Sequence, residues 1–237
     1  MSAPERFDSV VIGGGQAGLA MGYQLQRLGH RFAILEANEH VGDSWRKRWD
    51  SLRLFTPGIY DSLKGMRFTG PMTSPPTKDQ IADYLQSYSE RLEMPVRTGV
   101  RVERIFREGS MLVVEAPGSR LEAANVIVAT GAFQNPRTPG FAAQLDPRIH
   151  QMHSVNYRNP SQLRPGSVLL VGAGNSGADI SLEVARDHKT YLAGRHPGHV
   201  PFRIEGKLTR NLVHVVRFLG HYLLNFGTPV GRKVLPK

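Results

Sequence analysis

The apolar positions of the chain fall into two similar units, each an apolar strand followed by a glycine-rich turn and a helix. The predicted strand, helix and strand of the first unit span residues 7–12, 16–29 and 31–36. In the second unit, the first strand and the helix together span residues 167–186, and the second strand spans residues 190–195. Each unit combines the short apolar runs of buried strands with the 3.6-residue period of a helix. The pattern therefore predicts two βαβ units of the kind that binds dinucleotides.

The segment between the two units contains three kinds of predicted structure. Residues 37–76 are irregular, and a long stretch of this kind in a compact domain is usually functional. A helix follows, with Thr77 as its N-cap and Pro95 just beyond its end. Short strands near 96–106, 111–115 and 120–122 predict an antiparallel meander, and 125–131 (NVIVATG) predicts a buried strand.

The predicted fold class is α/β, with two Rossmann-like units and a small antiparallel meander. Five prolines between residues 132 and 166 mark a crossover between domains. We expect residues 1–164 to form the N-terminal part of one dinucleotide-binding domain and residues 165–237 to form part of a second. The helix predicted over 211–226 carries only a narrow polar stripe, so most of its circumference must be covered.

The glycine spacing in the two turns is the same. The glycines are Gly13, Gly15 and Gly18 in the first turn, and Gly172, Gly174 and Gly177 in the second. In such a loop the first glycine permits a tight turn, the second lets the backbone approach a pyrophosphate, and the third lets the helix pack close to the strand. The strand–turn–helix context supports phosphate binding at the helix N-terminus over a merely structural turn.

The residue that ends the second strand of each unit differs between the two sites. Glu36 lies 21 residues after Gly15, where a carboxylate accepts hydrogen bonds from ribose hydroxyls. Arg195 lies 21 residues after Gly174, where a guanidinium attracts the 2′-phosphate of NADPH. A solvated surface arginine is the alternative for Arg195. Glu36 and Arg195 together predict FAD at the first site and NADPH at the second.

Composition narrows the chemistry. The 237 residues include no cysteine, which excludes electron transfer to a disulfide and thiol-based peroxidase chemistry within this chain. We find no signal peptide, no apolar stretch long enough to span a membrane and no metal-ligand spacing, and we expect a cytoplasmic protein. Residues 186–237 hold ten Lys and Arg against two acids, a net charge of +8. No nucleic-acid motif accompanies them, so we attribute the charge to a phosphate-rich cofactor or to an acidic segment outside this chain.

Five stretches resemble flavin-dependent monooxygenases with two glycine loops, and they lie in the order that this family uses. They are VVIGGGQAGLA, VGDSWRKRWDSLRLFTP, VIVATGAFQNPRTP, HSVNYRNP and VLLVGAGNSGAD. The chain looks most like bacterial predicted flavoproteins sometimes linked to potassium transport, and like plant YUCCA-type enzymes. The resemblance covers nearly the whole chain and is far more specific than either glycine loop alone.

The resemblance implies roles for individual residues. Trp45 would lie beside FAD, with loop packing as its alternative role, and Thr130 and Gly131 match the element at the domain crossover. The residues implied to hold FAD are Gly13, Gly15, Gly18 and Glu36, and those implied to hold NADPH are Gly172, Gly174, Asn175, Ser176, Gly177 and Arg195. His153 and Tyr157 match H-x-x-x-Y, the back half of the family's motif, whose front half is missing here, and we interpret His153 as structural or interdomain. No catalytic side chain is evident.

The activity that the resemblance implies is monooxygenation. NADPH would reduce FAD, O2 would form a C4a-hydroperoxide on the flavin, and a small substrate would take one oxygen atom. An NADPH-dependent flavin reductase or oxidase and a non-catalytic nucleotide-binding protein are the alternatives. In this family the chain continues and returns to the FAD domain, so the sequence resembles a fragment. We expect the absent segment to cover the apolar side of 211–226, with self-association or an interfacial membrane helix as alternatives.

Overall fold

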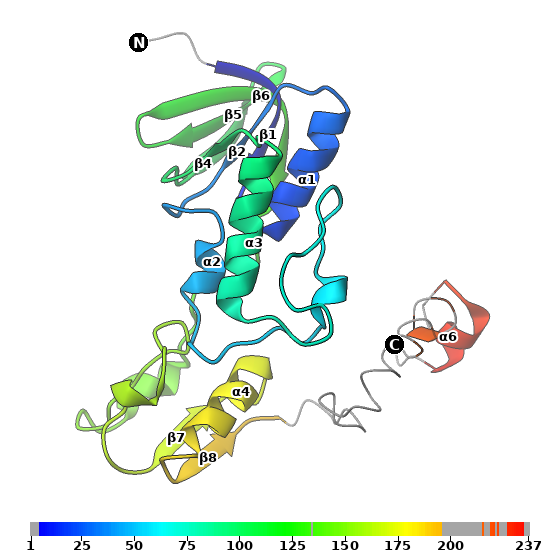
Figure 1. Cartoon of the computed structure of the whole chain (residues 1–237). Helices are drawn as coiled ribbons and strands as arrows, with labels where there is room; N and C mark the ends of the chain where they lie inside the picture. Colours follow the sequence, from blue (N-terminus) through cyan, green and yellow to red (C-terminus); the bar gives the residue numbers. More distant parts are fainter. Residues whose placement is uncertain are drawn as a thin grey trace. The chain divides into compact units, whose positions relative to one another are not determined.

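The computed structural model describes residues 5–133, 135–195, 215, 219, 220, 222 and 227–234 (Figure 1). The chain divides into two compact units, Met1–Ala193 and Gly194–Lys237. In the second unit, the helix α6 spans Pro229–Val234. Three residues of the helix predicted over 211–226, Val215, Leu219 and Tyr222, are helical with exposed side chains. Apart from these and the helical Gly220, that prediction lies outside the described residues.

The first unit is built on a six-stranded mixed sheet with the order β3-β2-β1-β6-β5-β4. The strands are β1 (Glu5–Ile12), β2 (Phe32–Leu35), β3 (Val96–Arg97), β4 (Arg104–Glu108), β5 (Met111–Ala116) and β6 (Ser119–Val128). The pairs β1–β2, β2–β3 and β1–β6 are parallel, whereas β4–β5 and β5–β6 are antiparallel. The strand β6 therefore belongs to both the parallel sheet and the meander.

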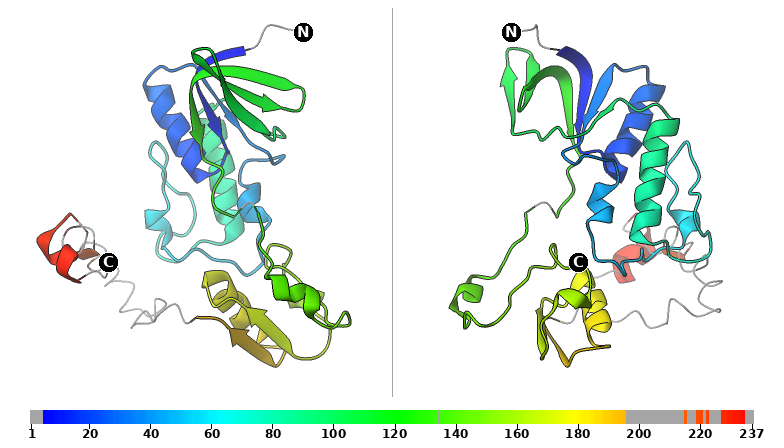
Figure 2. Two further views of the ribbon diagram at one scale, coloured as in Figure 1. Left: turned by 180° about the vertical axis from the view of Figure 1, so that it is seen from behind. Right: turned by 60° about the vertical axis from the view of Figure 1, so that its left-hand side comes forward.

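Successive residues of the central strands alternate between two apolar layers. Val11 and Ile34 point to one face, where they pack against the helices α1 (Gln16–Arg27) and α3 (Lys78–Arg91). Val10 and Leu35 point to the other face and pack against residues of the meander, such as Val114. Figure 2 shows the two helices side by side on one face of the sheet. This arrangement buries both faces of β1 and β2, as a parallel sheet requires.

The meander prediction is correct in kind but wrong in its strand boundaries. The strand expected near 96–106 is two strands, because β3 joins the parallel sheet and only β4 belongs to the meander. The strands expected at 120–122 and 125–131 are one ten-residue strand, β6. The expected burial of 125–131 is also wrong, since Val128 is 64% exposed. Among the described residues, the stretch 125–128 is paired with β1 on one side, but β5 on the other side ends its pairing at Ala123.

Local sequence signals explain the helix boundaries. The Thr77 hydroxyl accepts a hydrogen bond from the Gln80 backbone N–H, and the Gln80 side chain accepts one from the Thr77 N–H, which forms a complete capping box for α3. The predicted start and end of α3 are thus confirmed.

The expected irregular region 37–76 contains two short helical elements, the helix α2 (Asp43–Arg46) and the 3-10 turn η1 (Gly58–Tyr60).

The second βαβ unit has the predicted elements. These are β7 (Val168–Val171), α4 (Asn175–Val184) and β8 (Thr190–Ala193), and the 3-10 turns η2 (Gly140–Gln144) and η3 (Pro160–Gln162) precede them. The strands β7 and β8 form a parallel two-stranded sheet. Ile180 and Val184 of α4 are buried in a cluster with Trp49, Leu52 and Tyr157. The predicted α/β fold with two βαβ units and a meander is confirmed.

Candidate dinucleotide-binding sites

The first glycine loop connects β1 to α1, and each of its three glycines answers a different steric need. Gly13 has φ +108°, and a Cβ there would lie 2.4 Å from the Ala129 carbonyl oxygen. A Cβ on Gly18 would lie 1.9 Å from the Gly13 carbonyl oxygen. By contrast, no described atom lies within 4 Å of the place that a Cβ on Gly15 would take. Gly13 and Gly18 are therefore required by the fold, whereas Gly15 leaves space open in front of the helix.

The N-terminus of α1 has the features of an anion site. Among the described side chains, none caps the helix at Gly15, and its first turn contains no acid. In α3, by contrast, the capping box and Asp79 already satisfy the first turn. The backbone N–H groups and the positive end of the helix dipole of α1 are therefore available to a phosphate. The open space at Gly15 lets a pyrophosphate reach these N–H groups. The residues present at the first loop therefore fit the pyrophosphate of a dinucleotide.

Glu36 lies directly after β2, where its carboxylate reaches the first glycine loop. Its Oε2 accepts a hydrogen bond from the Gly14 backbone N–H, at 2.7 Å. Its Oε1 accepts two hydrogen bonds from Asn38, one from the backbone and one from the side chain. Sequence reasoning missed Asn38, because a loop asparagine carries no periodic signal. The structure thus brings Glu36 to the loop as expected and adds Asn38 beside it.

Trp45 and the crossover element also lie at the first loop. The Trp45 indole Nε1 donates to the side-chain oxygen of Gln16, the first residue of α1, at 3.4 Å. The Ala129 backbone N–H donates to the Ile12 carbonyl at 2.8 Å, which places the following Thr130 and Gly131 beside the glycine turn. Trp45 is also partly buried against two apolar clusters, so its expected alternative role in packing coexists with its place at the loop.

The second glycine loop repeats the backbone of the first. Gly172 has φ +110°, and the N-cap Gly174 has φ −76° and ψ −175°, against −78° and −174° at Gly15. A Cβ on Gly177 would lie 1.9 Å from the Gly172 carbonyl oxygen, the same distance as in the first loop. The described residues again include no side-chain cap for α4 and no acid in its first turn. The predicted residues Asn175 and Ser176 are the first two of that helix.

Two basic residues, Lys189 and Arg195, flank β8 in the sequence. Arg195 is exposed and follows Gly194, two positions after the last residue of β8. Lys189 precedes β8, and its Nζ lies 5.5 Å from the centre of the Tyr191 ring. Arg195 belongs to the second compact unit, and its role toward the second loop stays a prediction.

Tyr157 joins the second βαβ unit to the segment around Trp49, which follows the first βαβ unit in the sequence. Its hydroxyl donates to Glu183 Oε2 of α4 at 2.8 Å, and its ring is buried beside Trp49. Burial, followed by the hydrogen bond to Glu183, raises the pKa of the Tyr157 phenol, which therefore remains a donor. Close by, the Asn159 side chain donates to Asp50 Oδ2 at 2.6 Å. His153 accepts a hydrogen bond at Nδ1 from the Val155 backbone N–H, which agrees with a structural role.

We expect Tyr157→Phe to lower the free energy of unfolding by about 1.5 kcal/mol, because it removes a part-buried hydrogen bond to a carboxylate while the ring packing stays. Urea denaturation of the full chain measures this change. Tyr191→Phe is the matched control, since Tyr191 is half exposed and its ring contact with Lys189 survives the substitution. Equal stability of the two variants would contradict a role for the Tyr157 hydroxyl.

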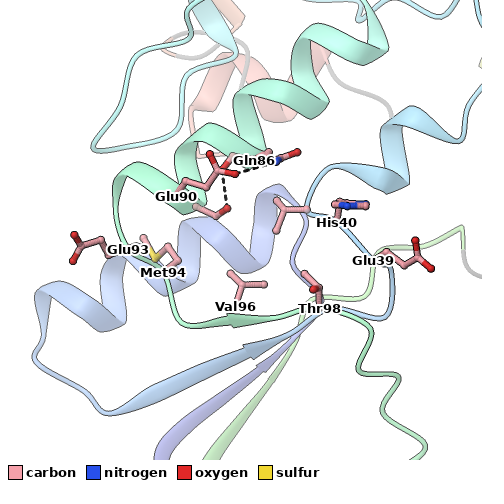
Figure 3. A pocket seen from close by; sticks show the side chains of 10 residues that line it. Glu39, His40, Gln86, Glu90, Glu93, Met94, Val96 and Thr98 are labelled. Carbon is pink, nitrogen blue, oxygen red and sulfur yellow. Dashed lines mark hydrogen bonds between the residues drawn. The ribbon is translucent and has the colours of Figure 1, made fainter.

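A hollow of about 330 Å³ lies on the α3 side of the unit (Figure 3). Its lining includes Glu39, His40, Glu90, Glu93, Met94 and Thr98, and no residue of either glycine loop. The three glutamates would repel the phosphates of a dinucleotide. The hollow is therefore unsuited to the phosphates of a dinucleotide.

Comparison with known families identifies the class of protein. Residues 10–200 match the model of the family described as pyridine nucleotide-disulphide oxidoreductase. The chain belongs to this family, and the proteins that it resembles include an oxidoreductase and a flavin monooxygenase. The chain itself contains no cysteine that could exchange with a disulfide.

The relatives include proteins named as monooxygenases and proteins named only as oxidoreductases. The chain is 42% identical to an uncharacterized CzcO-like oxidoreductase of Geobacillus kaustophilus, over 96% of this chain and 68% of that protein. It is 31% identical to the indole-3-pyruvate monooxygenase YUCCA1 of Oryza sativa, over 88% of this chain and 49% of the enzyme. A flavin-containing monooxygenase from Stenotrophomonas maltophilia has a similar structure, with a TM-score of 0.75 and 34% identity, over 79% of this chain and 57% of that one.

Relatives of the family bind both cofactors. The solved complex of OTEMO contains FAD and NADP, and at 20% identity with a TM-score of 0.65 its likeness to this chain shows the fold alone. The chain spans about half the length of the rice relative and 57% of the Stenotrophomonas enzyme. Within the described residues, no helix combines the length and the hydropathy needed to cross a bilayer.

Proposed function

We propose that this chain binds FAD at the first glycine loop and NADPH at the second, as part of a flavin monooxygenase that uses O2 and a small organic substrate. The observation that carries this proposal is the duplication of the loop, whose N-cap angles agree within two degrees. One such loop accounts for one dinucleotide. Two loops in one chain support the meeting of two dinucleotides, which is what hydride transfer between a nicotinamide and a flavin requires.

The proposed domain division follows from the two loops. Residues 1–164 would form the FAD-binding part, and residues 165–237 would form part of the NADPH-binding domain. The Tyr157–Glu183 hydrogen bond and the cluster around Trp49 join these parts within the first compact unit. Such contacts would hold the second loop in a defined position relative to the first, and positioning is the main task of a protein in cofactor chemistry.

Each proposed site uses its own glycine loop and one charged residue that follows the second strand of the unit. At the first, the backbone N–H groups of α1 bind the pyrophosphate and Glu36 accepts the ribose hydroxyls. At the second, the N–H groups of α4, including those of Asn175 and Ser176, bind the pyrophosphate, and Arg195 binds the 2′-phosphate. The bound flavin would supply the redox chemistry, in which NADPH, O2, a proton and the substrate give NADP⁺, water and the oxygenated product.

A reductase or oxidase without oxygenation is the second candidate. It is supported by the sequence, in which we recognise no side chain that would direct oxygen to a substrate. In that reaction NADPH, a proton and O2 give NADP⁺ and hydrogen peroxide. A non-catalytic nucleotide-binding role is the third candidate. The three candidates differ in two measurable quantities, bound flavin and the fate of oxygen.

We expect the purified chain to carry yellow flavin absorbance and to consume NADPH in air. With a thioether or a ketone as substrate, oxygenated product should form in proportion to the NADPH consumed. Mass spectrometry of the product and a peroxidase assay for hydrogen peroxide measure the partition. Peroxide equal to the NADPH consumed, with no product, would support the oxidase, and a colourless chain that binds no added FAD would overturn the proposal.

A further inference from the structure

We propose that Asn38 and Lys47 are positioning residues that fix the Glu36 carboxylate for the adenosine ribose of FAD, so that the first site selects FAD over FMN. The inference rests on the proposed binding of FAD at the first glycine loop. It concerns a chain of three side chains, Lys47, Asn38 and Glu36, which lies outside the glycine motif.

The Glu36 carboxylate is held from two sides. Both N–H donors on Oε1 come from Asn38, the backbone N–H at 2.8 Å and the side-chain Nδ2 at 2.6 Å. The donor on Oε2 is the Gly14 backbone N–H at 2.7 Å. A carboxylate oxygen has two lone-pair positions. Oε1 is therefore saturated by Asn38, whereas Oε2, the oxygen bonded to the glycine loop, keeps one position for a ribose hydroxyl.

Asn38 is in turn fixed by groups on both sides of it. Its side-chain Oδ1 accepts a hydrogen bond from Lys47 Nζ at 2.6 Å, and its backbone carbonyl accepts one from the Gly99 N–H at 2.8 Å. The Lys47 contact fixes the direction of the amide, because an oxygen that faces an ammonium leaves the Nδ2 group toward Glu36. An amide held in this way cannot rotate to present its oxygen to the carboxylate.

Lys47 is placed by the short helix α2, which is anchored to α3. Arg46 of α2 donates through Nη2 to Asp83 and Gln86 of α3, each at 2.9 Å. Lys78 at the start of α3 donates to the Arg46 carbonyl at 3.3 Å. The anchored α2 therefore carries Trp45 to Gln16 and Lys47 to Asn38, on two sides of the first glycine loop.

The consequence is a carboxylate that is oriented before the ligand arrives. A site whose polar groups are locked by supporting hydrogen bonds loses less conformational freedom on binding. FMN contains the flavin and a phosphate but lacks the adenosine ribose, so it cannot use Glu36. The contribution of Asn38 and Lys47 should therefore appear in FAD binding and not in FMN binding.

The test measures flavin binding by fluorescence. It uses the full 237-residue chain from which any bound flavin has been removed. We expect Asn38→Ala to raise the Kd of FAD about tenfold, the effect of losing roughly one hydrogen bond to a charged group, and to leave the Kd of FMN unchanged. Lys47→Met should have a smaller effect, about threefold, because its side chain is 58% exposed. Asn125→Ala is the matched control, since its side chain donates to the Asp8 carbonyl and to no group of the first glycine loop among the described residues, and it should bind FAD as the native chain does.

A double-mutant cycle decides whether Asn38 acts through Glu36. If it does, Glu36→Gln and the double variant Glu36→Gln/Asn38→Ala should bind FAD equally weakly. Additive losses would overturn the proposal and indicate that Asn38 contacts the ligand by itself. Likewise, Lys47→Met should add nothing in the Asn38→Ala background, and an added loss would indicate a direct phosphate contact instead.

The outcomes separate this inference from the proposed function. If the native chain binds FAD and the Asn38 and Lys47 variants bind it equally well, the positioning role is wrong and the FAD site stands. If the Asn38→Ala variant loses FAD and FMN affinity alike, selection through the ribose is wrong. If the folded native chain binds no FAD, both the site and the positioning role fail. Thermal melting of each variant verifies that it is folded.

Discussion

Gly15→Val is expected to abolish FAD binding and to leave the fold intact. Within the described structure, nothing lies within 4 Å of a Cβ at this position, so the branched side chain meets no protein atom at its first carbon. The same space is where a pyrophosphate would approach the N–H groups of α1. The measurements are flavin content after reconstitution with FAD and the thermal melting of the variant.

Two control variants distinguish a blocked ligand from a damaged fold. Gly140→Val also places a Cβ where the described atoms leave space, in the turn η2, and it should keep full flavin occupancy. Gly18→Ala places a Cβ 1.9 Å from the Gly13 carbonyl oxygen, which forces the helix away from the strand. It should therefore lower the melting temperature as well as the flavin content. Full flavin occupancy in Gly15→Val would remove the FAD site from this loop.

Arg195→Ala is expected to weaken NADPH binding by about 1.5–3 kcal/mol, a rise in Kd of roughly ten- to 150-fold, because it removes a charge-assisted hydrogen bond to the 2′-phosphate. NADH lacks that phosphate, so its affinity should be nearly unchanged. Titration of each nucleotide against the native chain and the variant measures the two constants. The native chain should prefer NADPH.

The control for this prediction is Arg148→Ala. Arg148 is an exposed arginine that pairs with the neighbouring Asp146, and its removal changes the net charge by the same amount. It should leave NADPH affinity within twofold of the native value, because Arg148 is already paired with Asp146 and is not among the residues assigned to the NADPH site. If Arg195→Ala weakens NADPH and NADH equally, the 2′-phosphate assignment is wrong.

Much of the candidate site could be predicted from the sequence because its parts are local. The positive φ of Gly13, the close approach of Gly18 to the Gly13 carbonyl and the N-cap at Thr77 each depend on residues a few positions apart. The same locality made the second loop predictable, since it repeats the spacing of the first. The side chain of Glu36 was predictable from its fixed distance in sequence after Gly15, which a βαβ unit of standard length converts into proximity.

The sequence by itself determined the two strand–turn–helix units and the residues that line them, since steric limits on glycine and helix capping act over one or two turns of chain. Only the tertiary structure decided that β6 is one strand shared by two parts of the sheet, and that its end is exposed at Val128. It likewise decided the contacts of Asn38 with Lys47 and of Tyr157 with Glu183. Such pairs join separate elements, and their hydrogen bonds depend on how those elements pack. The periodicity of either segment does not encode that packing, so no local pattern could reveal them.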